Sequence, residues 1–276
     1  MKKDYVKKRV LCISIAIRPG IFGSIVHNAG YKALGLNWIY IPFKVTNLQD
    51  TIKGIRALGI RGCSVSMPFK ETVIPFLDKL DPIAKKAKAV NTIVNNDGYL
   101  TGYNTDVLGI QKCLSLFKIK NNQKIIVLGS GGVARAVLTA LQNLNLKNII
   151  LTNRTSQRGK DLAREFKIDF TLWTKRQNIF ADIIINTTSI GMHPNTNVLP
   201  ISESQILNSQ IVMDVIVSSK NTKLIQIAKK YKKITIEGTD LALNQAYEQF
   251  KVYTGRNPPK HIMKKTVQEI FNSGKK

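Results

Sequence analysis

Lys70 and Asp106 are the two residues of this sequence best suited to move a proton during a reaction. Lys70 lies in Ser-Met-Pro-Phe-Lys-Glu (66–71), and Asp106 ends Tyr-Asn-Thr-Asp (103–106). A carbonyl group that is reduced by hydride needs a proton donor at the developing alkoxide. A lysine that lies beside a carboxylate and is partly screened from water can hold that proton and release it. The residues alone equally allow a structural ion pair, because Asp106 occupies an N-cap position.

A glycine-rich turn follows this polar cluster and predicts a nucleotide site. It begins 23 residues after Asp106, follows the apolar run Lys-Ile-Ile-Val-Leu (124–128) and precedes a helical pattern. Glycines at this spacing let the backbone approach a pyrophosphate at a helix N-terminus, where free amide groups favour anions. A bare tight turn is the alternative. The predicted cofactor-binding residues of the turn, which has the spacing Gly-x-Gly-x-x-Ala, are Gly129, Ser130, Gly131, Gly132, Val133 and Ala134.

The end of the next apolar run indicates which dinucleotide binds. An NAD site places a carboxylate about 20 residues after the glycine turn, on the ribose 2′-hydroxyl. Here Asn153, Arg154, Thr155 and Arg158 follow the run, and no acidic residue occurs before Asp161. Two guanidinium groups and a hydroxyl suit a 2′-phosphate, so we predict NADP rather than NAD. For Arg158, a solvated charge at the start of a helix is the alternative.

Short β-branched runs alternate with longer amphipathic stretches, which predicts an α/β fold with βαβ units and mostly parallel sheets. Asn96-Asp97-Gly98 predicts a hairpin with a type I′ turn between Val90–Asn95 and Tyr99–Gly102. The other expected strands are Val10–Ile15, Trp38–Phe43, Cys63–Ser66, Lys124–Leu128, Asn148–Thr152, Asp182–Asn186, Ile211–Val215 and Ile234–Glu237. The expected helices are Ser24–Leu34, Leu48–Leu58, Lys70–Leu80, Asp106–Phe117, Val133–Leu144, Ser156–Phe166, Thr222–Tyr231, Leu241–Thr254 and His261–Phe271.

The composition favours a two-domain protein with an anionic ligand. A chain of 276 residues exceeds the size at which one core grows comfortably. Lysine and arginine outnumber aspartate and glutamate by 42 to 17, a net charge of +25 that attracts anions from nucleic acid to carboxylates and phosphates. The basic residues are scattered, without a stripe of interleaved aromatic residues. We therefore expect a small-molecule carboxylate substrate rather than nucleic acid.

The cysteines and the apolar segments indicate a cytoplasmic protein without a membrane partner. Cys12, Cys63 and Cys113 are an odd, widely spaced set, so we expect neither a disulfide framework nor a metal site. The charged and apolar start of the chain superficially resembles a signal peptide, but it has no Ala-x-Ala cleavage site, and we expect a buried first strand instead. No segment approaches the roughly 20 apolar residues of a membrane helix.

Seven segments, in this order and at this spacing, resemble the shikimate dehydrogenase family over nearly the whole chain. They are Ser-Met-Pro-Phe-Lys-Glu (66–71), Ala-Val-Asn-Thr (89–92), Tyr-Asn-Thr-Asp (103–106), Gly-Ser-Gly-Gly-Val-Ala-Arg-Ala (129–136), Asn-Arg-Thr (153–155), Asn-Thr-Thr-Ser-Ile-Gly-Met (186–192) and Asn-Gln-Ala-Tyr-Glu-Gln-Phe (244–250). The resemblance implies an N-terminal mixed α/β substrate domain of residues 1–105, completed by helices in 239–276. It also implies an NADP-binding Rossmann domain of residues 106–238, with a cleft where the domains meet.

The resemblance also implies an activity and roles for single residues. The activity is the NADP-dependent interconversion of 3-dehydroshikimate and shikimate, or of a close cyclic hydroxy acid such as quinate, within aromatic amino acid and chorismate biosynthesis. Lys70 and Asp106 match the catalytic dyad. Ser66, Asn91 and Gln245 match substrate-binding residues. Asn153, Arg154, Thr155 and Arg158 match the residues that bind the 2′-phosphate of NADP in the family. Thr188 and Met192 match further cofactor-binding residues.

Several positions depart from the family pattern around the substrate carboxylate. The family carries Ser-x-Ser-Pro before the histidine of its first helix, where this chain has Ile21 and Gly23. Ser24 is our predicted substitute, with Ser14 and Arg18 as alternatives. Further departures are Ser64 for an asparagine, Val217 for a tyrosine, and Gly238-Thr-Asp-Leu for Gly-Leu-Gly-Met. Arg-Pro-x-x-Phe-Gly (18–23) and Cys-x-Val-Ser-Met-Pro-Phe-Lys-Glu-Thr (63–72) resemble the shikimate dehydrogenase-like subgroup, which is expected to oxidise shikimate poorly.

Two functions from other classes remain alternatives at this point. A basic nucleic-acid-binding protein on the same fold is motivated by the net charge of +25. A non-catalytic NADP sensor is motivated by the missing carboxylate serines. His27, on the first expected helix, is interpreted as a packed helix residue rather than as a base. We expect a monomer or a homodimer.

Overall fold

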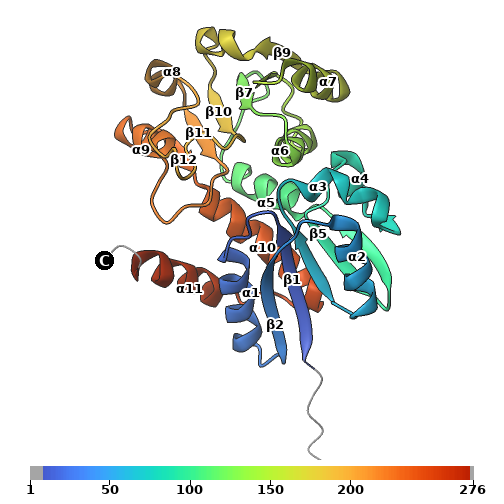
Figure 1. Cartoon of the computed structure of the whole chain (residues 1–276). Coiled ribbons are helices and arrows are strands. Elements are labelled where there is room, and N and C mark those ends of the chain that lie inside the picture. Colours follow the sequence, from blue (N-terminus) through green and yellow to red (C-terminus); the bar gives the residue numbers. More distant parts are fainter. Residues whose placement is uncertain (1–8, 274–276) are drawn as a thin grey trace, which may run out of the picture. The chain divides into compact units, whose positions relative to one another are not determined.

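The computed structural model describes residues 9–273 and divides into two compact units (Figure 1). The first unit contains the chain up to Thr105 and again from Ala246, and the second unit contains Asp106–Gln245. The chain therefore changes unit inside two helices, α5 (Thr105–Leu114) and α10 (Gly238–Thr254). Residues 1–8, the charged start of the segment that resembles a signal peptide, lie outside the described residues.

The first unit is built on a mixed six-stranded sheet with the order β2-β1-β3-β5-β6-β4. Strands β2, β1 and β3 run parallel, β5 is antiparallel to both β3 and β6, and β4 runs parallel to β6. The sequence pattern thus predicted both the parallel part and the antiparallel hairpin. The strands are β1 (Val10–Ala16), β2 (Trp38–Lys44), β3 (Gly62–Val65), β4 (Lys79–Leu80), β5 (Thr92–Asn96) and β6 (Tyr99–Tyr103).

The hairpin between β5 and β6 has the predicted two-residue turn. Asn96 pairs with Tyr99, and the residues between them, Asp97 and Gly98, have φ angles of 52° and 90°. Two successive positive φ angles define a type I′ turn, whose twist matches that of the strands. The Asn95 side chain stabilises the turn by accepting a hydrogen bond of 2.7 Å from the Gly98 N–H.

The helices of the first unit differ from expectation between Phe69 and Ala87. The predicted helix Lys70–Leu80 is wrong: α3 (Phe69–Thr72) is a single turn, a 3₁₀ turn spans Ile74–Phe76, and β4 follows. Pro75 explains the break, because proline has no N–H and its ring collides with the preceding helical turn. The other helices are α1 (Phe22–Ala33), α2 (Leu48–Ala57), α4 (Pro82–Ala87), the end of α10, and α11 (Lys260–Ser273).

The two faces of the first sheet carry different residues because side chains alternate along a strand. Ile13 and Ile15 of β1 belong to a core that includes Ile52 and Ile55 of α2. The other face carries hydroxyl groups at one level of the sheet, since Ser14 of β1 pairs with Ser64 of β3, which pairs with Thr92 of β5.

Helices α1 and α10 cover this hydroxyl-bearing face. The His27 ring of α1 stacks on Tyr40 of β2 with 4.7 Å between the ring centroids. A Cβ atom on Gly62 of β3 would collide with the Tyr253 ring of α10, so the helix approaches the strand closely. The covering helices thus pack on a face that carries hydroxyl groups, and this face is where a polar site can form.

The second unit contains a parallel six-stranded sheet with the order β12-β11-β10-β7-β8-β9. The chain starts in the centre at β7, fills one side, then returns to fill the other, which is the order of a Rossmann fold. Edge strand β9 is missing from our expectation because its four residues form no apolar run. The strands are β7 (Ile125–Leu128), β8 (Ile149–Asn153), β9 (Asp169–Leu172), β10 (Ile183–Asn186), β11 (Ile211–Asp214) and β12 (Ile234–Ile236).

Helices and strands of the second unit alternate as predicted. Ile126, Ile184 and Val212 of the sheet pack with residues of α8 and α9 in one core. The helices are α5, α6 (Gly132–Asn143), α7 (Ser156–Phe166), α8 (Glu203–Asn208), α9 (Lys223–Lys230) and the start of α10, with a 3₁₀ turn at Trp173–Asn178. The predicted fold class, an α/β protein with a mixed-sheet unit and a Rossmann unit, is confirmed. Across residues 9–273, no helix has the length and apolar character needed to cross a membrane.

Candidate active site and cofactor site

The first unit brings Ser66, Lys70 and Asn91 together at the end of β3. The Val65 N–H donates to the Asn91 carbonyl at 2.8 Å, and the Val90 N–H donates to the Lys70 carbonyl at 2.7 Å. The Phe69 N–H closes the intervening turn by donating to the Ser66 carbonyl at 2.9 Å. These backbone bonds tie the loop after β3, the turn α3 and the start of β5 into one assembly. Three of the predicted site residues therefore share one polar end of the sheet.

Asn91 is held rigidly at this end of the sheet. Its side chain is 2% exposed, its Oδ1 accepts a 2.8 Å hydrogen bond from the Thr105 N–H, and its Nδ2 donates to Thr105 Oγ1 at 3.0 Å. The buried amide thus connects β5 to the first residue of α5.

Asp106 and Gln245, two further predicted site residues, belong to the second unit. Asp106 lies in the first turn of α5 and is 7% exposed. Gly109, one turn further along α5, packs against α10 so closely that a Cβ atom there would lie 2.9 Å from the Gln245 backbone nitrogen. Helices α5 and α10 thus cross near both residues. Because Lys70 is in the first unit, the catalytic pairing of Lys70 with Asp106 stays a prediction.

Gly23, at the position of a family serine, faces the hydroxyl group of Tyr40. A Cβ atom on Gly23 would lie 2.9 Å from Tyr40 Oη. That hydroxyl is hydrogen-bonded to the side chains of Ser14 and Ser64, while burial raises the pKa of Tyr40 and keeps the phenol neutral. Three hydroxyl groups therefore meet beside the missing serine. Sequence reasoning weighed Ser14 and noted Ser64 but missed Tyr40, which reaches Gly23 only through the packing of α1 on β2.

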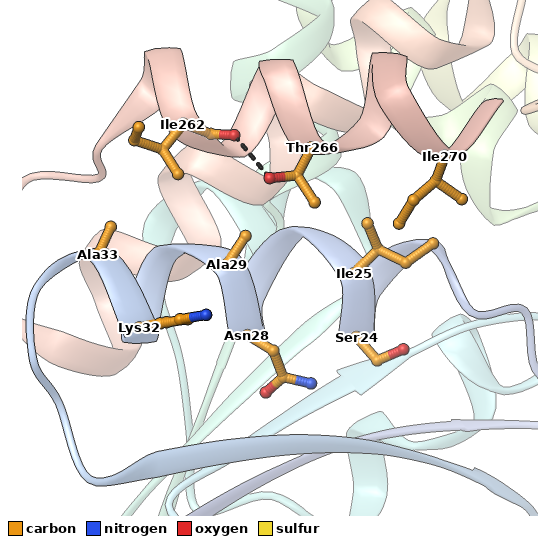
Figure 2. Close-up of a pocket in the computed structure, with 9 residues that line it drawn as sticks. All are labelled: Ser24, Ile25, Asn28, Ala29, Lys32, Ala33, Ile262, Thr266 and Ile270. Atoms are coloured by element: carbon orange, nitrogen blue, oxygen red, sulfur yellow. Dashed lines mark hydrogen bonds between the residues drawn. The ribbon is translucent and has the colours of Figure 1, made fainter. Parts of the chain in front are cut away.

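Ser24, the predicted substitute for the missing serines, makes a local contact. Its hydroxyl donates to the Ile21 carbonyl at 2.8 Å. Ser24 also lines an open hollow of about 800 Å³ between α1 and α11. Figure 2 shows Ile262, Thr266 and Ile270 of α11 facing α1 across this hollow. Neither observation connects Ser24 with Ser66, Lys70 or Asn91, and its role in substrate binding stays a prediction.

The glycine turn of the second unit has the conformation that a pyrophosphate site requires. Gly129 has a φ of +106°, and a Cβ atom there would lie 2.7 Å from Thr187 Oγ1, so glycine is needed at this position. Helix α6 begins at Gly132, and Gly131 at its N-cap provides no side-chain cap. A Cβ on Gly131 would meet no atom within 4 Å. Uncapped N–H groups and open space above them are what a phosphate needs, so the turn fits a dinucleotide.

The predicted 2′-phosphate grip lies where β8 passes into α7. Arg154, Thr155 and Arg158 are exposed there, and the first turn of α7 contains no acidic residue. The Asn153 side chain donates to the Thr155 carbonyl at 2.9 Å and so fixes the turn that carries these residues. The arrangement offers two cationic side chains and no carboxylate to a ribose phosphate, which fits NADP.

Thr188 and Met192 lie in the loop after β10, which a buried network supports. Thr188 Oγ1 donates to Asn186 Oδ1 at 2.7 Å, and Asn186 Nδ2 donates to Asp214 Oδ1 at 3.1 Å. Burial raises the pKa of Asp214 from 3.8 to about 6. Hydrogen bonds to the carboxylate, such as the 2.6 Å bond that Thr222 Oγ1 donates to Asp214 Oδ2, lower the pKa and oppose part of this effect. Sequence reasoning missed this network because its members are 28 and 8 residues apart. Met192 is 39% exposed.

The described residues contain no group of three or more histidine, cysteine, aspartate or glutamate side chains arranged to hold a metal ion. Cys12, Cys63 and Cys113 are free and buried.

Two α/β units, one with a hydroxyl-bearing mixed sheet and one with a Rossmann sheet and a glycine turn, define the class of dinucleotide-binding proteins with a separate substrate unit. The chain belongs to the shikimate dehydrogenase family of oxidoreductases. Three family models match it: the shikimate dehydrogenase substrate binding domain at residues 22–93, shikimate / quinate 5-dehydrogenase at 112–215, and the shikimate 5′-dehydrogenase C-terminal domain at 238–268.

Individual relatives agree with the family models. The chain is 40% identical to a shikimate dehydrogenase-like protein of Haemophilus influenzae, over 93% of this chain and 95% of that protein. A solved shikimate dehydrogenase in complex with NADP+ superposes with a TM-score of 0.84 at 33% identity, covering 96% of each chain. The Thermus thermophilus shikimate 5-dehydrogenase in complex with NADP(H) and shikimate superposes with a TM-score of 0.82 at 25% identity, covering 95% of this chain and 98% of that one.

Proposed function

We propose that this protein is an NADP-dependent oxidoreductase that interconverts a cyclic 3-keto acid and its alcohol. 3-Dehydroshikimate and shikimate are the first candidates, and quinate is the nearest alternative. The observation that carries the proposal is the grouping of Ser66, Lys70 and Asn91 at one end of the first sheet by backbone hydrogen bonds. Relatives that share the fold include enzymes solved with shikimate and NADP(H). Placement in the cytoplasm and in chorismate biosynthesis is part of the same proposal.

Lys70 is the proposed proton donor of the reaction. NADPH, when bound, supplies the hydride that reduces the carbonyl carbon. Lys70 holds a proton at Nζ and gives it to the carbonyl oxygen as negative charge develops there, which yields the secondary alcohol. Asp106 is the orienting carboxylate of the pair. In the oxidative direction, Lys70 takes the hydroxyl proton back.

The substrate carboxylate is assigned to the hydroxyl groups of Ser14, Tyr40 and Ser64. A neutral phenol and two serine hydroxyls can each donate to a carboxylate oxygen, and hydrogen bonds to a charged acceptor are the strong ones. The support for this assignment is that Tyr40 Oη lies beside Gly23, where the family places a serine. The hydroxyl groups thereby replace the missing serines and give the site a different shape, so shikimate, quinate and related acids must be compared.

The proposed cofactor site consists of the glycine turn and the segment where β8 passes into α7. Gly129–Ala134 would hold the pyrophosphate through backbone N–H groups, and Arg154 and Arg158 would bind the 2′-phosphate. The Asn153 side chain fixes the turn between β8 and α7 by its hydrogen bond to the Thr155 carbonyl.

Turnover assays test the proposal directly. The purified protein is mixed with NADPH and 3-dehydroshikimate, and separately with shikimate or quinate and either oxidised cofactor. Calorimetry measures NADP and NAD binding in parallel. Turnover of at least one acid, with preference for NADP, is the expected result. Binding of NADP without turnover of any of these acids would contradict the proposal and favour a cofactor sensor.

A further inference from the structure

A chain of buried hydrogen bonds in the first unit connects His27 of α1 with Asn91. His27 Nε2 lies 3.0 Å from Gln249 Oε1, Gln249 Nε2 lies 2.8 Å from Thr92 Oγ1, and Thr92 Oγ1 lies 2.8 Å from Asn91 Oδ1. All four side chains are at most 2% exposed. Because water is excluded, each hydrogen bond is strong and each missing partner is costly.

Backbone groups determine the amide orientations of Asn91 and Gln249 in this chain of hydrogen bonds. The Thr105 backbone N–H can only donate, so the atom of Asn91 that it meets at 2.8 Å is the oxygen. An amide oxygen carries no hydrogen, so Thr92 is the donor in its 2.8 Å contact with Asn91 Oδ1, and Thr105 Oγ1, at 3.1 Å, is a second acceptor within reach of the same hydroxyl. The Gln249 atom that faces Thr92 also lies 3.4 Å from the Asn91 backbone carbonyl, which can only accept, so this atom is the NH₂ group and the amide oxygen faces His27.

The same reasoning assigns the tautomer of His27. Its Nε2 faces an amide oxygen, so Nε2 carries the proton and Nδ1 is the bare acceptor. Burial lowers the pKa of His27 to about 4, so the ring is neutral near pH 7. Nδ1 has no hydrogen-bond partner among the described residues, a cost that an apolar side chain would avoid. The Nε2–H donor is therefore the feature for which a histidine at this position is useful.

The chain of hydrogen bonds also determines what Asn91 offers to a ligand. Asn91 Oδ1 is occupied by the Thr105 N–H and the Thr92 hydroxyl. One Nδ2 hydrogen is directed to Thr105 Oγ1, and the amide has a second one. Asn91 can thus act on a ligand only as a donor, and its matching atom is an oxygen lone pair, such as that of a ring hydroxyl or of the carbonyl that is reduced.

His27 also contacts Tyr40, one of the three residues whose hydroxyl groups are proposed to bind the substrate carboxylate. Its ring is stacked on Tyr40 with an interplanar angle of 10°. The ring of Phe250 of α10 is also nearly parallel to the His27 ring, with an interplanar angle of 4° and 6.1 Å between the ring centroids. One buried ring therefore contacts Tyr40 by stacking and is connected to Asn91 by hydrogen bonds.

We propose that His27 is a positioning residue that, through Gln249 and Thr92, reinforces the orientation that Thr105 gives to Asn91 and so keeps Asn91 an obligate hydrogen-bond donor to a substrate oxygen. This proposal rests on the proposed function, since it takes Asn91 as a substrate-binding residue. His27 itself touches neither the substrate nor the cofactor in this role. It acts on substrate affinity through the orientation of one amide group.

The first test compares two near-isosteric substitutions of Thr92. Thr92→Val removes the hydroxyl that donates to Asn91 Oδ1, whereas Thr92→Ser retains it. We expect Thr92→Val to raise the KM for the cyclic acid about 5- to 10-fold, the effect of one misdirected hydrogen bond, with the KM for NADP unchanged. Thr92→Ser should stay within about 2-fold of the wild type. Equal KM values for Thr92→Val and Thr92→Ser would overturn the proposal.

A second pair addresses His27 itself. His27→Gln places an amide donor near the position of Nε2, and His27→Leu places none there. We expect His27→Gln to recover most of the substrate affinity that His27→Leu loses. A purely structural role would lower the melting temperature of both without separating their KM values, and that result would also overturn the proposal.

A spectroscopic test does not depend on turnover or on a variant that folds. The chain has three histidines, so ¹⁵N shifts of the ring nitrogens in labelled wild-type protein can be assigned to His27, His193 and His261. We expect His27 to be neutral at pH 7 with its proton on Nε2. A proton on Nδ1, or a charged ring, would overturn the directed hydrogen-bond chain. If the wild type turns over none of the acids, the proposed function fails, and this measurement still decides the chain of hydrogen bonds separately.

Discussion

The two units differ in how their site residues relate to the family pattern. In the second unit, the glycine turn and the arginines after β8 match that pattern, and their geometry depends on local backbone conformation, such as the φ of +106° at Gly129. In the first unit, Lys70 and Asn91 match, but Ile21 and Gly23 occupy the positions where the pattern has serines, and Tyr40 of β2 reaches Gly23 of α1. Under the proposed function, this chain retains the family's cofactor binding and proton transfer, and the group that selects the acid has changed.

Removing the proposed proton donor should have the largest effect. We expect Lys70→Met to lower kcat by roughly 10²- to 10⁴-fold, the usual contribution of general acid catalysis, with little change in NADP affinity. Lys79→Met is the control, because Lys79 is an exposed lysine of the same unit. Steady-state kinetics and calorimetry measure the two effects. Comparable losses in kcat and in NADP affinity would indicate that Lys70 has a structural role. The first unit would then no longer be the one that supplies the proton donor.

The buried carboxyl group of Asp214 should make the second unit sensitive to pH. Its folded pKa of about 6 lies above the ordinary value of 3.8, so the folded state binds this proton more tightly than the unfolded state does. The associated stabilisation is complete below about pH 4 and is lost as the pH rises through 6, by on the order of 3 kcal/mol in total.

Urea unfolding at several pH values tests this expectation for Asp214. The wild-type free energy of unfolding should fall relative to that of Asp214→Asn between about pH 4 and pH 7, because asparagine does not titrate there. Profiles that stay parallel over this range would show that Asp214 titrates normally despite its burial.

The arginine grip should determine the choice of cofactor. We expect Arg154→Gln to raise the KM for NADP roughly 10- to 50-fold, the value of a hydrogen bond to a charged phosphate, while NAD kinetics stay unchanged. Arg164→Gln is the matched control, because Arg164 lies on α7, the helix that follows Arg154, and forms an exposed ion pair with Asp161. An equal loss for NADP and NAD would indicate that Arg154 does not bind the 2′-phosphate.

Substitution of Tyr40 should have the smallest effect of these variants, and it tests where the substrate carboxylate binds. We expect Tyr40→Phe to raise the KM for the cyclic acid about 10-fold, or ~1.4 kcal/mol, because one of three carboxylate donors is lost. The KM for NADP should not change. Tyr99→Phe is the control on the same sheet, since Tyr99 is 52% exposed. An unchanged substrate KM in Tyr40→Phe would mean that the carboxylate binds elsewhere, and Ser24 would then regain priority.

Local sequence patterns predicted most elements and failed where several short elements follow one another. The helix predicted over Lys70–Leu80 ignored Pro75, and α4 was missed although Asp81 caps it and Pro82 starts it. Helix α8 was missed as well, although Ser202 and Gln205 form a capping box at its start. These signals were present in the sequence. Strand β9 offered no such signal, because a four-residue edge strand depends on its neighbour for its conformation.

The sequence by itself determined the glycine turn, the Asp97-Gly98 hairpin, the alternation of strands and helices and the set of family motifs. These features depend on backbone dihedral preferences and on side-chain periodicity, which neighbouring residues decide. Only the tertiary structure decided that Tyr40 meets Gly23 and that His27, 222 residues away from Gln249, shares a hydrogen bond with it. Such contacts join elements that are distant in the sequence. They follow from which helix packs on which face of the sheet, and no local preference contains that information.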